Sequence, residues 1–195
     1  MLEPALALLE FDSIALGIQA GDAMVKRAPV SRIQSGTVHP GRYLVLVAGD
    51  VASVEEALKA GQALAQQELR DFVFLPQIHP DVVSALGGER PGRPGDAVGI
   101  VETSTVAAAI RAADAGVKGA DVGLWQLRLA DGLGGKGLVL FTGLVADVEA
   151  AVEIGCGRVS DHLIRSVIIA QLHEEMQVNL RLSGRFGETS NWQIF

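Results

Sequence analysis

The chain repeats itself, and this duplication constrains its fold more than any other feature of the sequence. In the first half of each repeat the matching residues stand 92 positions apart: Glu10 and Glu102, Asp22 and Asp114, Lys26 and Lys118. Farther on, the separation becomes 94 positions, as between Gln77-Ile78-His79 and Gln171-Leu172-His173. The two repeats follow each other in direct order, so the chain is predicted to fold as two homologous domains.

A Gly- and Pro-rich segment at 87–96 separates the repeats, because neither a helix nor a central strand tolerates this composition. We expect a first domain over 4–86, a linker over 87–96 and a second domain over 97–178. Residues 179–195 form a tail without a counterpart in the first repeat. Each domain is small enough that burial within the chain alone leaves it marginal.

Each repeat shows the pattern of a small α+β unit. In the first repeat, apolar runs predict strands, and periodic segments with a capping Ser13 and a stop at Pro29 predict helices. The expected elements are a strand over 5–11, a helix up to Ala28, a weak strand over 30–34, a strand over 43–48, a helix over 51–69, a strand over 72–75 and a short helix from Pro80. This βαββαβ order with a short extra helix predicts a sheet covered by helices on one face.

Composition excludes several functions. The net charge of −7 provides no basic stripe for nucleic acid, and no run of 18 apolar residues provides a membrane span. The single cysteine, Cys156, excludes an intrachain disulfide and a Cys-based metal site within one subunit. These features predict a soluble cytoplasmic protein without a membrane or nucleic-acid partner. About a quarter of the residues are alanine or glycine, which predicts closely packed layers.

Four sequence features, taken together, resemble the bacterial microcompartment (BMC) shell domain. They are Glu102 followed by Thr103, the run Ala112-Ala113-Asp114-Ala115-Gly116-Val117-Lys118, a Gly-rich loop before an apolar strand, and a terminal strand that ends at His79 or His173. Two such domains in direct order resemble the trimeric tandem-domain shell proteins. The resemblance covers residues 5 to about 177.

The resemblance implies a structural protein rather than an enzyme. Members of this type form pseudohexameric homotrimers that tile into a shell with hexameric and pentameric shell proteins, and small metabolites cross a central pore. The implied pore-loop residues are Val38, His39, Pro40, Gly41 and Arg42 in the first repeat and Gly132, Leu133, Gly134, Gly135 and Lys136 in the second. The implied tile-edge residues are Lys26, Lys118, His79 and His173. The family's edge arginine is missing from both terminal strands, which leaves the lateral contacts open.

The resemblance leaves the chemistry of the loops open. One relative holds an iron–sulfur cluster at a pore-loop cysteine, but neither loop has one here, so no cofactor is expected. His39 is either a solvated loop residue or, through threefold symmetry, a metal ligand; the solvated reading is favoured. Arg42 and Lys136 either form a cationic rim that draws anionic or polar metabolites, or are solvated charges on one face or contacts between chains.

Other residues have structural interpretations. The stretch 132–137 matches G-x-G-x-x-G, but a strand follows it where a dinucleotide site needs a helix. Glu10 and Glu102 are expected to anchor helices or interfaces. The histidines that end the terminal strands, His79 and His173, are expected to pack or to cap a helix. His162 is interpreted as surface variation. The rivals to a shell protein are a metal- or electron-carrying pore protein and a small-molecule sensor or enzyme on a ferredoxin-like sheet.

Overall fold

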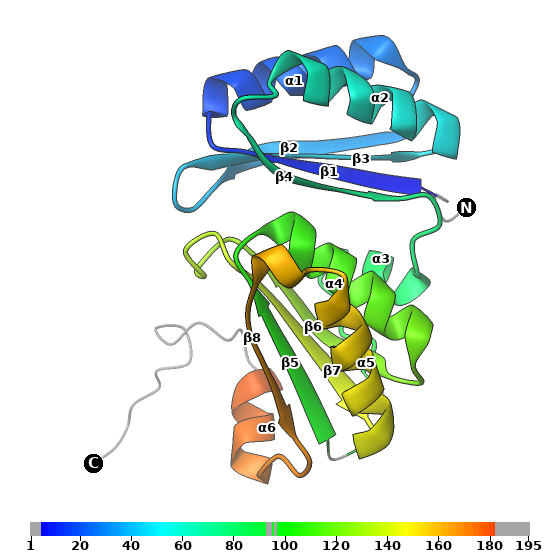
Figure 1. Ribbon diagram of the computed structural model, residues 1–195, viewed down its shortest axis with the longest axis vertical. Coiled ribbons are helices and arrows are strands. Elements are labelled where there is room, and N and C mark those ends of the chain that lie inside the picture. The colour runs from blue at the N-terminus through cyan, green and yellow to red at the C-terminus, as the bar shows by residue number, and fades with distance from the viewer. Residues whose placement is uncertain (1–4, 93–94, 96, 182–195) are drawn as a thin grey trace.

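The computed structural model describes residues 5–92, 95 and 97–181, which form two similar units one after the other (Figure 1). The elements of the first repeat are β1 (Ala5–Phe11), α1 (Ile14–Arg27), β2 (Arg32–Val38), β3 (Arg42–Gly49), α2 (Val51–Leu64), β4 (Leu69–Leu75) and α3 (Pro80–Leu86). Those of the second are β5 (Ala97–Thr103), α4 (Val106–Gly119), β6 (Gly123–Leu129), β7 (Gly137–Gly143), α5 (Val145–Gly157), the 3-10 turn η1 (Ser160–His162), β8 (Leu163–Ile169) and α6 (Glu174–Arg181).

Both sheets have the same topology, which confirms the predicted tandem α+β fold. The strand orders are β2-β3-β1-β4 and β6-β7-β5-β8, and every neighbouring pair is antiparallel. The register shifts between Glu10 and Phe11 in the first sheet and between Glu102 and Thr103 in the second. These irregularities fall at matching positions, so the repeats correspond residue by residue at this end of the sheet.

The predicted helix starts agree with local capping. The Ser13 hydroxyl accepts a hydrogen bond from the Leu16 amide at the start of α1, and Thr105 accepts one from the Ala108 amide at the start of α4. Such caps satisfy amide groups that the first helical turn leaves without a partner. In Figure 1, α1 and α2 cover one face of the first sheet, as the sequence predicts.

Several element boundaries differ from the expectation, among them the start of β4, which lies at Leu69 rather than 72. Helix α2 ends at Leu64 rather than 69, because Leu69 already pairs with Phe11 in the sheet. Strand β2 covers Arg32–Val38 rather than 30–34, because it pairs with β3 along its whole length. Helix α6 continues to Arg181, past the proposed end of the second domain at 178.

The first strand is buried on both faces, which ties the two repeats together. Its odd-numbered residues, such as Leu9, pack against the helices of the first repeat. Its even-numbered residues Leu6 and Leu8 join the core that contains α4 of the second repeat. Because successive strand residues point to opposite faces, one strand serves both cores. None of the helices formed by the described residues is long and apolar enough to cross a membrane.

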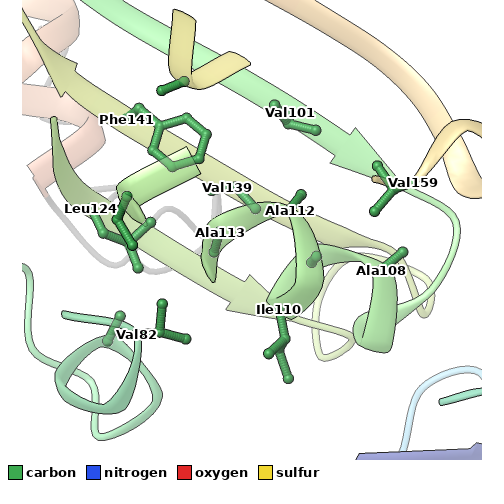
Figure 2. Packing of buried hydrophobic residues seen from close by; sticks show 14 of the residues in the cluster. Val82, Val101, Ala108, Ile110, Ala112, Ala113, Leu124, Val139, Phe141 and Val159 are labelled. Carbon is green, nitrogen blue, oxygen red and sulfur yellow. The ribbon is translucent and has the colours of Figure 1, made fainter. Parts of the chain in front are cut away.

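Small residues allow α4 to lie close to its sheet. Ten of its fourteen residues are buried, and most of those ten are alanine, glycine or valine. Figure 2 shows Ala112 and Ala113 of this helix above the sheet, near Phe141 and Val139. A Cβ atom added at Gly116 would stand 2.4 Å from the Phe141 ring. The alanine and glycine content therefore brings helix and sheet together at this position.

We expect Gly116→Ala to destabilise the fold by about 1–3 kcal/mol, because overpacking at the Phe141 ring outweighs the helical preference of alanine. Gly157→Ala is the matched control, since nothing lies within 4 Å of its added Cβ. That variant should be neutral or stabilising by less than about 1 kcal/mol. Urea unfolding followed by circular dichroism measures both, and equal stability of the two variants would contradict the packing argument.

Candidate functional site

A buried carboxylate joins the two repeats. Glu10 lies at the end of β1 and is fully buried. Its Oε2 accepts a hydrogen bond of 2.9 Å from the amide of Val106, in the first turn of α4, and its Oε1 accepts one of 2.7 Å from Arg42. A carboxylate at the N-terminus of a helix is favoured because the positive end of the helix dipole lies there. Glu10 therefore anchors a helix of the other repeat, as expected.

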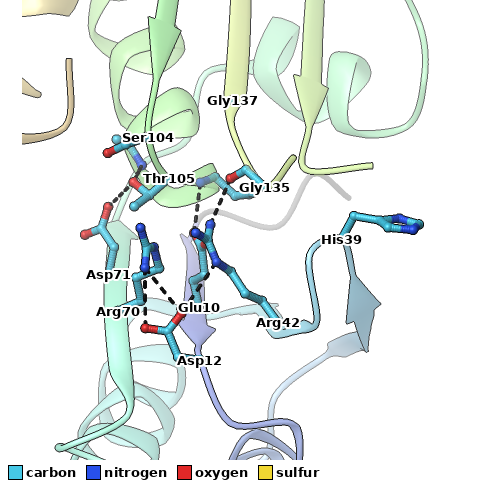
Figure 3. A network of polar contacts seen from close by, with 12 residues as sticks. Glu10, Asp12, His39, Arg42, Arg70, Asp71, Ser104, Thr105, Gly135 and Gly137 are labelled. Atoms are coloured by element: carbon cyan, nitrogen blue, oxygen red, sulfur yellow. Dashed lines mark hydrogen bonds and ion pairs between the residues drawn. The ribbon is translucent and has the colours of Figure 1, made fainter. Parts of the chain in front are cut away.

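Arg42 completes this contact from the start of β3. Its guanidinium also donates to the Gly135 carbonyl at 3.0 Å, and its side chain is only 12% exposed (Figure 3). Burial raises the pKa of Glu10, while the Val106 amide and Arg42 act in the opposite direction. The structure thus places Arg42 in a contact between the two repeats of one chain, a role that the sequence did not predict. A Cβ at Gly135 would meet Arg42 at 2.6 Å, so the glycine makes room for the contact.

A second polar cluster lies beside the first and centres on Asp71 of β4. Thr105 donates its hydroxyl to Asp71 at 2.5 Å, and Arg111 pairs with it at 3.1 Å. The His162 Nε2 lies 3.6 Å from Asp71, and the Nδ1 of the same ring lies 3.2 Å from the Ser104 hydroxyl. All four partners of the cluster belong to the second repeat, so Asp71 holds the repeats together.

The role of this cluster was not evident from the sequence. His162 is a contact residue between repeats, so its interpretation as surface variation is wrong. Asp71, Thr105 and Arg111 were missed as well. The available signal was that these positions break the duplication: His162 stands where the first repeat has Glu68, and Asp71 where the second has Arg165.

The two lysines implied as edge residues have different surroundings. Lys118 pairs with Asp114 at 2.6 Å and donates to the Gln77 carbonyl of the first repeat. Lys26 is exposed and pairs with Asp22 of its own helix. Lys118 thus lies at the contact between repeats, whereas Lys26 presents the same group to solvent.

The terminal histidines both cap short helices. The His79 ring accepts from the Asp81 amide at 3.2 Å, and the His173 ring accepts from the Glu175 amide at 3.3 Å. The His79 amide in turn donates to Asp114 at 2.8 Å. Capping is therefore confirmed as a role of both side chains, and His79 also contributes to the contact between repeats.

The two candidate pore loops lie side by side. The His39 amide donates to Asp131 at 3.1 Å, and the His39 ring lies 3.4 Å from the same carboxylate. Both side chains face solvent, with 81% and 51% exposure. Lys136, which is 49% exposed, pairs with Glu102 at 2.7 Å and does not line the hollow between the loops. His39 and Asp131 are thus the exposed ionisable groups of this hollow, which Thr37, Val38, Gly41 and Gly132 also line.

Comparison with known proteins agrees with the tandem fold. The BMC domain matches residues 5–78 and again 97–172. The chain belongs to the BMC domain family. It carries two copies of the domain in direct order, and this membership confirms the expected family and its structural shell role.

Its relatives match either the whole chain or one repeat. Bacterial microcompartment shell protein PduT of Citrobacter freundii is 40% identical over 177 residues, which cover 90% of this chain and 96% of that protein. Shell protein PduA of the same organism is 35% identical over 88 residues, 44% of this chain and 95% of PduA. A crystal structure of a microcompartment protein from Desulfitobacterium hafniense matches with a TM-score of 0.77 and 38% identity, over 90% of this chain and 99% of that one. These relatives do not favour the sensor, enzyme or electron-carrier alternatives.

We expect Arg42→Ala to destabilise the protein by about 3 kcal/mol at about pH 7, because it leaves the buried Glu10 carboxylate without its cation. The loss should shrink towards about pH 5: burial raises the pKa of Glu10 in the folded state, so protonation there favours the folded form. Urea unfolding at both pH values measures this change.

The variant Lys59→Ala serves as the control, since Lys59 is exposed and its loss should change stability little. Adding Glu10→Gln to Arg42→Ala should recover part of the stability, because the unpaired charge is removed. A loss independent of pH that Glu10→Gln does not relieve would argue against the buried ion pair.

Proposed function

We propose that three copies of this chain close into a pseudohexameric plate. The proposal rests on one observation. The two surfaces that form the contact between the repeats, on α4 and β4, each have an exposed counterpart in the other repeat, on α1 and β8. Ile110 of α4 is 0% exposed, whereas the matching Ile18 of α1 is 54% exposed. On the strand side, Val73 of β4 is 2% exposed and the matching Val167 of β8 is 44% exposed. A second copy that docks β8 on α1 buries both surfaces.

The polar groups of the contact recur in the same way. Glu102 and Lys136 correspond to Glu10 and Arg42, and they form the same ion pair at the same distance of 2.7 Å. In the proposed contact Glu102 accepts from the Ile14 amide of the next copy, as Glu10 accepts from Val106 within the chain. The exposed Lys26 then meets the end of a β8 strand, as Lys118 meets the end of β4.

The contact joins two different surfaces, α1 on one copy and β8 on the next. Such a heterologous contact produces a ring when the rotation closes. If every junction repeats the geometry of the joint within the chain, the ring alternates first and second repeats. The family resemblance supports closure at three chains and six domains.

The ring would place three copies of each candidate pore loop, 38–42 and 132–136, around one axis. His39 and Asp131 would then stand at the opening, while Arg42 and Lys136 hold the junctions behind it. The plate would tile with hexameric and pentameric shell proteins in the shell of a cytoplasmic microcompartment and pass small polar metabolites. Support comes from relatives named as microcompartment shell proteins and from a structural role rather than a catalytic one.

In sedimentation velocity, the purified chain should have three times the mass of one copy, and Ile18→Asp should release monomers because a charge in the buried junction is unfavourable. Leu144→Asp is the control: Leu144 is exposed and stands at the start of α5 where the first repeat has the capping Asp50. That variant should stay trimeric. A native monomer at all concentrations, or dissociation in both variants alike, would contradict the trimer.

The variant Asp131→Lys should raise the entry of small anions into assembled shells by about tenfold and lower that of cations, because a confined opening concentrates the field of its charges. The initial rate of an encapsulated reporter enzyme on an anionic substrate measures entry. Glu153→Lys makes the same charge change on α5 and should leave the rate unaltered. Equal rates in all three shells would exclude Asp131 from the opening.

A further inference from the structure

The ionic contact that Asp71 makes between the repeats has a counterpart on the exposed surfaces of the chain. In that counterpart the charge on the strand side has the opposite sign. Asp71 of β4 stands opposite Glu10 of β1, and Arg165 of β8 stands opposite Glu102 of β5. The two positions correspond in register, beside the same irregularity of the sheet. The strand side of the contact thus carries an acid in the first repeat and a base in the second.

The charges on the other side of the contact change as well: one basic position becomes acidic and the other becomes neutral. Asp71 meets Arg111 and His162, which the first repeat replaces with Gln19 and Glu68. One backbone hydrogen bond at the His162 position recurs in both repeats. The Ser104 amide donates to the His162 carbonyl at 2.8 Å, and the amide of the matching Asp12 donates to the Glu68 carbonyl at 3.0 Å. Glu68 therefore occupies the place from which His162 reaches Asp71.

We propose that Arg165 of one copy forms an ion pair with Glu68 of the next copy, and that this pair selects which repeat meets which. The inference rests on the trimer proposed above. Within the described part of the chain, neither the Arg165 guanidinium nor the Glu68 carboxylate makes a hydrogen bond or an ion pair. Asp12 stands beside Glu68, but Arg70 at 3.3 Å and Arg42 at 3.5 Å already offset its charge. Glu68 is thus the acid available to Arg165.

The inversion makes the junction selective. Docking of like repeats would require the joint within the chain to open, since that joint already covers Asp71. A first repeat docked on another first repeat would then place Asp71 against Glu68, two carboxylates. A second repeat docked on another second repeat would place Arg165 against Arg111 and His162, all basic. Only unlike repeats bring opposite charges together, and like charges in an interface suppress the wrong pairing. The partner that these surfaces fit is a second copy of this chain, placed so that first and second repeats alternate.

The test compares trimer dissociation on dilution, by sedimentation velocity of the full chain at low salt. Arg165→Glu and Glu68→Arg should each raise the concentration of half-dissociation by about tenfold, since each places like charges at every junction. The double variant Arg165→Glu/Glu68→Arg restores opposite charges and should recover tight assembly. Lys59→Glu makes the same charge change as Arg165→Glu on the exposed α2 and should assemble as the native chain does.

The outcomes separate this inference from the trimer itself. A native trimer whose single variants dissociate no more than Lys59→Glu would overturn the ion pair and leave the trimer standing. Weakening by the single variants without recovery in the double variant would overturn it too, because Arg165 would then act through another group. A native chain that never trimerises would remove both proposals. Unchanged far-ultraviolet circular dichroism shows that each variant is folded.

Discussion

The arrangement of this molecule depends on one buried carboxylate, that of Glu10. A charge without solvent is tolerated only where hydrogen bonds and a counter-ion replace water. Here the replacement comes from two directions: the Val106 amide of the second repeat and Arg42 of the first. Glu10 thus holds the start of α4, and Arg42, paired with Glu10, also holds the Gly135 carbonyl of the neighbouring loop. The need to replace water around one buried group thus sets a contact between the two repeats that the apolar core and the Asp71 cluster reinforce.

The need of this carboxylate for partners also explains why the contact between the two repeats is a guide to the proposed contact between copies. Glu102 and Lys136 reproduce the pair of Glu10 and Arg42, but among the described residues no helix start donates to Glu102. The apolar residues show the same relation: Ile110 of the second repeat is buried, whereas the matching Ile18 of the first repeat is exposed. A duplicated chain contains one complete junction and the two halves of another. In the proposed trimer, the two exposed halves meet for the same physical reason that holds the covered junction together.

The sequence could predict features with local causes and those repeated in both halves. Ser13 and the apolar run of β3 specify a helix start and a strand from nearby residues, and the separation of 92 to 94 positions revealed the tandem fold. The end of α2 was missed because Leu69 joins the sheet through its pairing with Phe11, a contact distant in sequence. His162 was misread for a similar reason. The role of His162 depends on its contact with Asp71, which lies in the first repeat. The second repeat has no acidic residue at the position that matches Asp71.

Fusion of two domains into one chain allows what six identical domains cannot have. In a ring of identical domains every junction carries the same residues, so an acid on the strand side must always meet the same helix side. With two repeats, Asp71 can face basic groups at one junction while Arg165 faces Glu68 at the next. Each charge is then attractive only in the alternating order. The positions where the duplication fails to match therefore carry information that the matching positions cannot: they distinguish neighbours that share one fold.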